Sequence, residues 1–584
     1  MMLRNLSFNL KPFLSLNSCQ RYVHHHSKKY KLSYVSSVTQ IPLLEHTTSQ
    51  RLDYAAEKFE NKESFVFCET GDRWTFKSLK QKSEDLASGL LALGLEKGDR
   101  VAIWAPNCQE WILTQYATAI AGLILVNINP SFKALELEYV LKKVNCKAII
   151  LSESYKTQNY VDILLSVCPE IQSSQGKINS KRLPDLNTVI LISHNHHKGF
   201  YSFEEVANGG ESTHVTKLES IRKKCQFSDP INIQFTSGTT GSPKAVTLSH
   251  HMLLNNAYFT GLSQDYHKYP ARICVQVPLF HCFGMVFGSL MTITHGSTVI
   301  LPSRTFNVEK SLESISKEKC TNIYGTPTMF IDLYSSSNLE KYDCSSVHGG
   351  IMAGSVCPIE VVDNCIKKLN TKNICVIYGM TETSPTITVN TIKDSLKHRT
   401  QSIGRTKEHL EIKIVDSEGK IVPVNEPGEL LVRGYNTMIG YWGEREKTDE
   451  IYTPDRFLRT GDIVRMDEDG FFYHQGRLKD MVIRGGENIY PKEIEEFLHT
   501  HPKIDDVYVI GVPDKRLGEE LCACIRVKKG EALTPNEIRE FCKDKIAHFK
   551  IPKFVEFMDE FPQTVSGKVK KNVLKETIIK KLKL

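Results

Sequence analysis

Hydrophobic and polar residues follow two different spacings along the first third of the chain. Ser78 to Leu93 places apolar residues at helical intervals, whereas Arg100 to Trp104 and Ala148 to Leu151 are short apolar runs typical of buried strands. Such an alternation predicts an α/β domain, and a second α/β run extends from about 250 to 400. Residues 171–230 between them are polar and irregular, and we expect a surface excursion there.

Beyond residue 404 the pattern changes to short alternating strands. Glu411 to Val415, Gly428 to Arg433 and Phe471 to Gln475 are separated by Gly, Pro and Asp turns, which predicts a small β-barrel or sheet. After Gly476, charges of both signs accompany a compact α+β pattern. It predicts helices near 491–500 and 535–547 and strands near 505–511 and 521–528. We therefore expect a large domain over 45–475, a hinge at 476–481 and a small mobile domain over 482–584.

Composition describes an ordinary globular protein. The chain has 584 residues, 41% hydrophobic and 24% charged, with a net charge of +7. No apolar run approaches the roughly 18 residues that a membrane span requires. The closest, Ile112 to Asn127, contains Gln115 and Tyr116 and favours a core helix. The 16 cysteines form no Cys-x2-Cys pair, which predicts free thiols and neither a zinc site nor a disulfide framework. The positive charge lies partly at the N-terminus, so it is weak evidence for nucleic-acid binding.

The N-terminal 44 residues differ from the rest. They contain no Asp or Glu, and their Arg and Lys residues lie among Ser, Leu and Phe. This composition is typical of a mitochondrial transit peptide, which would direct the protein to the matrix; the alternative is a disordered basic tail. The C-terminal Leu-Lys-Leu lacks the small residue that a peroxisomal signal requires.

One segment, residues 236–244, has the composition of a phosphate-binding loop. It is Thr-Ser-Gly-Thr-Thr-Gly-Ser-Pro-Lys, after an apolar strand-like run and before an expected helix at Leu248 to Asn256. Glycine lets backbone amides approach an anion, and hydroxyls add donors. A strand–loop–helix of this kind predicts a nucleotide-phosphate site. Pro243 before Lys244 excludes the Walker A pattern. The alternative is a polar surface loop.

Four further segments carry candidate chemistry. Tyr378 to Pro385 contains Glu382 beside hydroxyls, a plausible Mg²⁺ ligand or a simple helix cap. Arg459 to Asp462 ends in a carboxylate after a Gly turn, a common feature when taken alone. Gly476 to Glu495 has a charged start, a buried strand, a Gly-Gly turn and Pro491 at an expected helix start. Pro562 to Lys568 places one lysine on a Gly-containing loop.

Together and in this order, the five segments resemble those of the adenylate-forming superfamily of acyl-CoA synthetases, adenylation domains and luciferases. The resemblance covers the chain from about residue 50. Gly349 to Ser355 and Phe561 to Lys568 are most similar to the mitochondrial medium-chain acyl-CoA synthetases. It implies that ATP and a carboxylate form an acyl-adenylate and pyrophosphate. The thiol of coenzyme A then displaces AMP, with Mg²⁺ as the cofactor.

The resemblance also implies residue roles. Lys568, His281 and Thr239 would be catalytic, Glu382 would hold Mg²⁺, Lys479 would be the hinge, and Gly485 and Gly486 would border the coenzyme A tunnel. The acyl pocket would involve His281, Phe283, Met285 and Ile351. The ATP site would comprise Ser237, Gly238, Thr239, Thr240, Gly241, Ser242, Pro243, Lys244, Ala245, Gly354, Ser355, Tyr378, Thr381, Asp462, Arg477 and Lys568.

One position departs from the family pattern, because Ala245 stands where the family loop usually has Gly. If that position needs a positive φ, we expect strain of about 1 kcal/mol or more and weaker ATP binding. Alternatives to a fatty acid ligase are an aryl or coumarate-type CoA ligase, a luciferase-like oxygenase, a carrier-loading adenylation domain and a catalytically inactive binding protein. No carrier domain follows in this sequence, which favours free coenzyme A.

Overall fold

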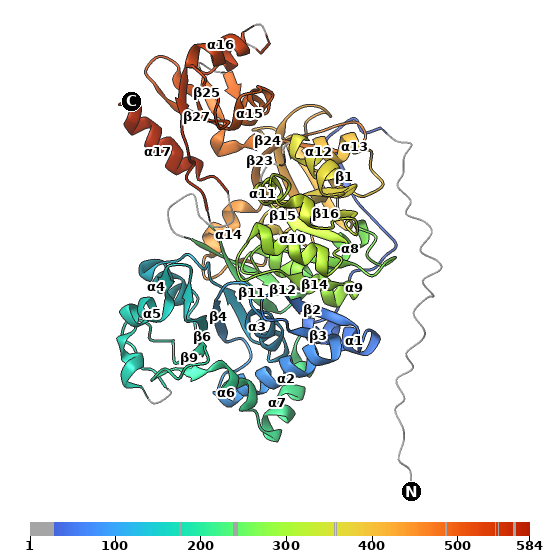
Figure 1. Cartoon of the computed structure of the whole chain (residues 1–584), viewed down its shortest axis with the longest axis vertical. Coiled ribbons are helices and arrows are strands. Elements are labelled where there is room, and N and C mark those ends of the chain that lie inside the picture. The colour runs from blue at the N-terminus through green and yellow to red at the C-terminus, as the bar shows by residue number, and fades with distance from the viewer. Residues whose placement is uncertain are drawn as a thin grey trace.

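The computed structural model describes residues 29–174, 177–236, 243–354, 357, 359–484, 487–543, 545–546, 548–564 and 568–584. Two large sheets, one smaller antiparallel sheet and a separate C-terminal unit organise these residues (Figure 1). This agrees with the predicted α/β class of a large domain followed by a small α+β domain. Within the described ranges, no helix is both long and apolar enough to cross a bilayer.

The first large sheet has eight strands in the order β10-β9-β6-β4-β5-β11-β12-β22. Its apolar runs are the buried strands that the sequence predicts, since β4 and β6 are buried along almost their whole length. The bounds are β4 Arg100–Trp104, β5 Ile124–Asn127, β6 Ala148–Ser152, β9 Thr188–Ile192, β10 Tyr201–Ser202, β11 Pro230–Thr236, β12 Lys244–Ser249 and β22 Gly440–Tyr441. Beside it, β7 Ser154–Tyr155 and β8 Gln158–Asn159 form a hairpin.

Two expectations for this region are wrong. The segment 171–230 contains the buried strand β9 and helices α6 Phe203–Asn208 and α7 Ser212–Lys224, because the apolar run Thr188–Ile192 pairs with β6. The run Ile112 to Asn127 is not one helix. Helix α3 Gln109–Ile120 ends before Gly122, whose φ of +67° suits glycine, and the chain continues as β5.

The second large sheet has nine strands in the order β19-β18-β17-β16-β15-β13-β14-β2-β3. Its central strands are parallel, so their carboxyl ends meet along one edge. The bounds are β2 Glu63–Phe67, β3 Arg73–Thr75, β13 Arg272–Val275, β14 Thr298–Leu301, β15 Asn322–Gly325, β16 Gly349–Met352, β17 Asn373–Tyr378, β18 Thr388–Val389 and β19 Arg405–Thr406.

Helices cover the two large sheets (Figure 1). Helix α2 begins at a capping box formed by Thr75 and Ser78, close to the predicted start. The remaining bounds in the large domain are α1 Thr48–Lys58, α2 Phe76–Ala92, α4 Ala134–Lys143, α5 Tyr160–Val167, α8 His250–Ser263, α9 Met291–His295, α10 Val308–Lys317, α11 Pro327–Tyr334, α12 Ile359–Lys368, α13 Leu396–Gln401 and α14 Arg445–Ile451, with the short 3-10 turns η2 Pro169–Ser173 and η4 Leu339–Lys341.

The smaller sheet is antiparallel, in the order β1-β20-β21-β23-β24, with β1 Tyr34–Ser36, β20 Leu410–Val415, β21 Gly428–Gly434, β23 Leu458–Met466 and β24 Phe472–Arg477. It matches the predicted β unit, as a sheet whose end strands are β1 and β24 rather than a closed barrel. Strand β1 lies inside the segment assigned to the leader.

Residues 29–44 belong to the folded domain, which contradicts a leader that extends to residue 44. The Ser33 amide donates to Val422 O (2.9 Å), and the Ser37 amide to Leu410 O (2.9 Å). Val35 is 8% exposed and joins the large core. Composition alone missed this because the segment is basic and polar, while its pairing partners lie almost 400 residues away.

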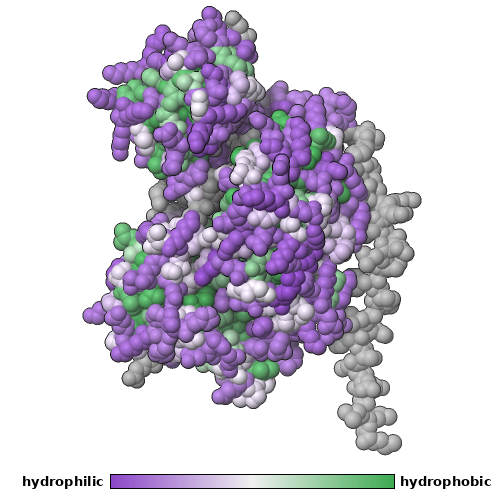
Figure 2. All heavy atoms as spheres, in the orientation of Figure 1, coloured by the Kyte–Doolittle hydropathy of each residue, from purple (hydrophilic) through white to green (hydrophobic). Residues whose placement is uncertain are grey.

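The C-terminal domain contains an antiparallel sheet of β25 Val482–Arg484, β26 Glu487–Ile489, β27 Ile504–Asp514 and β28 Gly518–Val527, with β29 Phe554–Phe557 parallel to β28. Helices α15 Pro491–His499, α16 Pro535–Cys542 and α17 Lys571–Leu582 flank it, with the 3-10 turn η7 His548–Lys550. Helix α16 is shorter than predicted, and α17 was not predicted. In Figure 2 most of the visible face is hydrophilic, and the surface narrows between this domain and the rest.

Candidate active site

The predicted phosphate loop connects two strands, so the expected strand–loop–helix is wrong. Thr236 at the end of β11 lies opposite Lys244 at the start of antiparallel β12. Residues 245–248 are Ala-Val-Thr-Leu, a buried extended segment between β11 and β22, and α8 begins only after the Ser249 cap. A helix N-terminus therefore does not supply the anion site. Ser237, Gly238, Thr239, Thr240, Gly241 and Ser242 lie outside the described residues.

Ala245 is unstrained. It lies within β12 opposite Phe235, it is not among the described residues with positive φ, and it is fully buried. Its carbonyl accepts the Trp442 amide (2.8 Å). The strain that a positive φ would impose does not arise at this position.

Lys244 and Glu382 share a neighbour, Tyr441 of β22. The Lys244 ammonium lies 4.8 Å from the centre of the Tyr441 ring, and the Tyr441 hydroxyl donates to Glu382 Oε1 (3.0 Å). Glu382 belongs to the 3-10 turn η5 Thr381–Thr383, just after β17, and is 7% exposed. Burial raises the pKa of Glu382, although the Tyr441 hydroxyl, Arg477 and Lys244 oppose the rise.

Asp462 is the most strongly ionised buried carboxylate of this region. It lies opposite Arg477 in the β23–β24 pairing and is 3% exposed. The Tyr378 hydroxyl donates to Oδ2 (2.6 Å), and Oδ1 lies 3.1 Å from Arg477 Nε. Burial alone would raise the pKa of Asp462, but His474, Arg477 and Tyr378 together lower it to about 2. The carboxylate is therefore anionic at neutral pH.

The carboxyl ends of β16 and β17 place Gly354 and Tyr378 at the same edge of the nine-stranded sheet. Ligands bind at this edge in open α/β sheets. Gly354 has a φ of +93°, a conformation that favours glycine. Thr381 lies beside the Cys282 thiol. Ser355 lies outside the described residues.

His281 precedes η3 Phe283–Leu290, a π-helix, which is a form often found at functional sites. The Phe283 amide donates to His281 Nδ1 (3.2 Å), so the imidazole proton belongs on Nε2. Burial, and then the positive charge of Lys568, lowers the pKa of His281 to about 4. His281 is therefore a neutral donor at physiological pH, close to Lys568.

Residues expected in the acyl pocket fall on two sides of η3. The Phe283 ring stacks on Tyr324 (centroids 6.0 Å apart), and Tyr324 lies opposite Ile351 in the β15–β16 pairing. Met285 instead contacts the eight-stranded sheet, with its sulfur 3.5 Å from both Asn127 Nδ2 and Gln234 Nε2. Phe283 and Ile351 therefore form one apolar wall, and Met285 lies apart from it.

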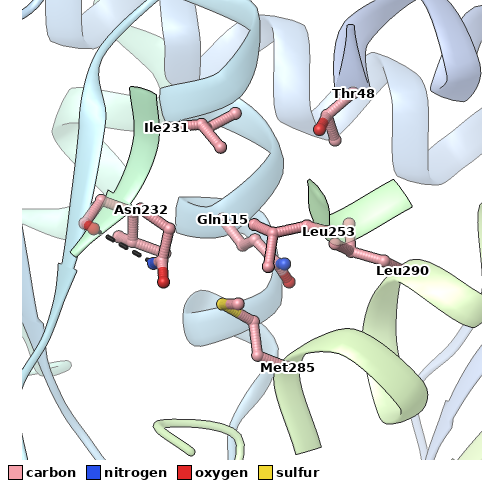
Figure 3. A pocket seen from close by; sticks show the side chains of 8 residues that line it. Thr48, Gln115, Ile231, Asn232, Leu253, Met285 and Leu290 are labelled. Carbon is pink, nitrogen blue, oxygen red and sulfur yellow. Dashed lines mark hydrogen bonds between the residues drawn. The ribbon is translucent and has the colours of Figure 1, made fainter. Parts of the chain in front are cut away.

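Met285 borders a small cavity between α3, β11, α8 and η3 (Figure 3). The cavity has a volume of about 10 Å³, which is close to the need of one water molecule. Gln115 Oε1 and Asn232 Oδ1 have no hydrogen-bond partner among the described residues. The cavity is lined by Thr48, Gln115, Leu125, Ile231, Asn232, Leu253, Met285 and Leu290.

Lys568 comes from the small domain, and its charge acts on residues of the large one. Its side chain is exposed at the surface. Loss of hydration, and then the positive charges of Arg477 and Lys479, lowers its pKa to about 8, against the opposing influence of Asp462 and Asp480. Lys479 itself lies exposed in η6 Leu478–Asp480, which connects the two domains. Gly485 and Gly486 lie outside the described residues.

Tyr441 and His474 were missed by the sequence reasoning. Tyr441 lies in an apolar Gly-Tyr-Trp stretch of a polar segment, which is a weak signal. His474 lies 3.6 Å from Asp462 Oδ1, and its alternation with Phe472 in β24 marked it as inward-facing.

The expectation of no zinc site remains a prediction. Within the described residues, no group of three or more His, Cys, Asp or Glu side chains is arranged to hold a metal ion.

Comparison with known proteins identifies the family to which this chain belongs. The AMP-binding enzyme family matches residues 52–442, and the AMP-binding enzyme C-terminal domain matches residues 493–568. Since the first match covers more than half of the chain, this protein belongs to the AMP-binding enzyme family, as the order of its motifs predicts.

Individual relatives narrow the comparison. The chain is 46% identical over 579 residues to the mitochondrial medium-chain acyl-CoA ligase ACSF2 of Danio rerio, covering 98% of this chain and 95% of the relative. It is 47% identical to the ligase of the same name from Rattus norvegicus, covering 95% and 91%. ATP-bound MatB from Rhodopseudomonas palustris superposes with a TM-score of 0.78 at 26% identity, covering 91% and 99%.

Proposed function

We propose that the protein is an acid–thiol ligase that activates a medium-chain fatty acid. The fatty acid carboxylate attacks the α-phosphate of ATP and forms an acyl-adenylate, releasing pyrophosphate. The thiol of coenzyme A then attacks the acyl carbonyl, and AMP leaves. The observation that carries this proposal is the position of Lys568, within electrostatic reach of Asp462, Arg477 and His281. The relatives named as medium-chain ligases support the chain length.

The cations answer the main difficulty of the first step, which brings two anions together. Preorganised positive charge at the reacting centre is the effective remedy. The positive charge of Lys568 acts on His281, and Lys568 would contact the carboxylate and α-phosphate. Arg477 and Lys244 add positive charge on the nucleotide side. By analogy with single oxyanion donors, the loss of Lys568 costs about 3 kcal/mol or more in this step.

The ribose and the acyl chain have separate partners. Asp462 is a buried anion that can accept the ribose hydroxyls, with Tyr378 and Arg477 fixing its orientation. Neutral His281 can donate from Nε2 to an acyl oxygen without adding charge. Beyond it, the apolar wall of Phe283, Tyr324 and Ile351 suits an alkyl chain.

Glu382 fits a Mg²⁺ site. It is a buried carboxylate whose pKa is raised by burial, and carboxylate oxygen is a ligand type that Mg²⁺ prefers. A single protein carboxylate is enough when phosphates and water complete the coordination. When bound, Mg²⁺ neutralises charge on the transferring phosphates.

Other roles stay proposals from the family resemblance. Residues 237–242, including Thr239, would enclose the β- and γ-phosphates, and Gly485 and Gly486 would border the coenzyme A path. Lys479 would be the hinge. We also place the protein in the mitochondrial matrix. Its leader would end upstream of Lys29, because β1 and the residues around it pack into the large domain.

The test is pyrophosphate release by protein lacking residues 1–28, with ATP, Mg²⁺ and saturated acids from acetate to palmitate, with and without coenzyme A. We expect a maximum near octanoate and thioester only when the thiol is present. A maximum with benzoate or coumarate would favour the aryl-ligase alternative. No turnover with any acid would favour the inactive binding protein.

A further inference from the structure

One lysine of the small domain contacts the large domain directly. Lys492, in the first turn of α15, donates from its ammonium to the carbonyl oxygen of His474 in β24 (2.8 Å). Figure 1 shows α15 beside β24 at the junction of the two domains. The Lys492 side chain is only 14% exposed, so water competes weakly for its hydrogen bonds.

The contact lies next to the nucleotide site. The His474 imidazole Nε2 is 3.6 Å from Asp462 Oδ1, and its ring centre is 5.8 Å from that of Tyr378. Burial lowers the pKa of His474, and the positive charge of Lys492 lowers it further. Lys492 therefore touches the residue that flanks the proposed ribose-binding carboxylate.

Among the described residues, Lys492 also lies 3.4 Å from Glu496 Oε1, one turn along the same helix, and that carboxylate is 62% exposed. Exposed pairs of this spacing contribute little to stability. The charged donor instead bridges the domains, where a hydrogen bond to a charged group is stronger than a neutral one.

We propose that Lys492 is a positioning residue for acyl-adenylate formation. By holding β24 it keeps the small domain in the orientation that brings Lys568 to Asp462, Arg477 and His281. It touches no reacting atom, so its effect passes through Lys568. The step that depends on Lys568 should need Lys492, and the reaction of coenzyme A with a finished adenylate should not.

This inference rests on the proposed two-step reaction, and the half-reactions are measured separately. In Lys492→Ala, adenylate formation from octanoate and ATP should fall about tenfold or more, the usual effect of losing a hydrogen bond from a charged donor. Thioester formation from supplied octanoyl-adenylate should stay within about twofold. Lys492→Arg, which keeps the charge, should recover part of the loss. Lys529→Ala, an exposed lysine of the same domain, is the matched control.

A double-mutant cycle distinguishes positioning from general damage. On a Lys568→Ala background, Lys492→Ala should not lower the rate of adenylate formation further, because Lys492 acts through Lys568 and that side chain is already absent. Additive losses, or equal losses in both half-reactions, would overturn the proposal. A wild-type protein that forms no adenylate would instead refute the proposed function.

A readout independent of chemistry completes the test. Lys479 is exposed in the connection between the domains, so tryptic cleavage after it reports how firmly the small domain is held. Mass spectrometry should show faster cleavage after Lys479 in Lys492→Ala than in the wild type or Lys529→Ala. Unchanged cleavage would contradict a clamp at Lys492, whether or not the protein is active.

Discussion

Asp462→Asn tests the proposed nucleotide site by removing one charge with little change of shape. The carboxylate accepts the Tyr378 hydroxyl and lies against Arg477 and His474. Asparagine keeps the size of the side chain but presents only one oxygen and no charge. Arg477 would then face the site without its anion, and the ribose hydroxyls would lose a charged acceptor.

The structure sets the scale of this effect. Asp462 has a pKa of about 2 against an ordinary 3.8, and a shift of that size corresponds to about 2.4 kcal/mol. Since the folded pKa is lowered, this stabilisation is present above pH 3.8 and is lost as the pH falls towards 2. For ATP, losing a charge-assisted acceptor costs about 1.5–3 kcal/mol, or roughly ten- to a hundredfold in affinity.

The assay is pyrophosphate release at varied ATP and saturating octanoate. Asp462→Asn should raise the ATP KM by that factor and should also unfold at a lower temperature at pH 7. The exposed Asp469→Asn, in the turn between β23 and β24, should behave as the wild type. A folded Asp462→Asn protein with an unchanged ATP dependence would refute the assignment of Asp462 to the ribose.

Three further predictions concern charge, the loop and the N-terminus. The kcat/KM of adenylation should fall as the pH rises through about 8, because Lys568 loses its proton there. In Lys568→Arg this decline should move to higher pH. A decline at an unchanged pH would exclude Lys568 as its source. Ala245→Gly should not improve ATP binding and should cost about 0.5–1 kcal/mol of stability, because a strand position without strain gains nothing from glycine. Thermal unfolding with and without ATP measures both effects. Protein lacking residues 1–44 should melt at a lower temperature than protein lacking 1–28, because it loses β1 and exposes the edge of β20; equal melting would restore the longer leader.

The buried parallel strands were predictable because their signal is local. Arg100 to Trp104 and Ala148 to Leu151 are apolar runs in sequence and strands in the structure, with bounds that differ by at most one residue. The five motifs also identified the family, because they occur in one order. Asp462 and Arg477, for example, belong to two separate motifs, and the structure places them directly opposite each other in the β23–β24 pairing.

The features that could not be predicted from the sequence depend on residues that lie far away along the chain. Strand β1 forms only because β20 presents an open edge, and Ala245 is unstrained only because β12 lies between β11 and β22. The side of η3 on which Met285 falls depends on the π-helix geometry, which the sequence pattern did not reveal. The contact of Lys492 with His474 arises from how two domains meet, which no periodicity encodes.

The most direct test of the account is to trap the intermediate. Protein lacking residues 1–28 is mixed in excess with α-labelled ATP, Mg²⁺ and octanoate without coenzyme A, and the reaction is quenched and separated. We predict octanoyl-adenylate in an amount close to that of the enzyme, converted to octanoyl-CoA and AMP when coenzyme A is added, at a rate no slower than kcat. Thioester formation with release of ADP and phosphate, or no adenylate at any time, would contradict the central claim.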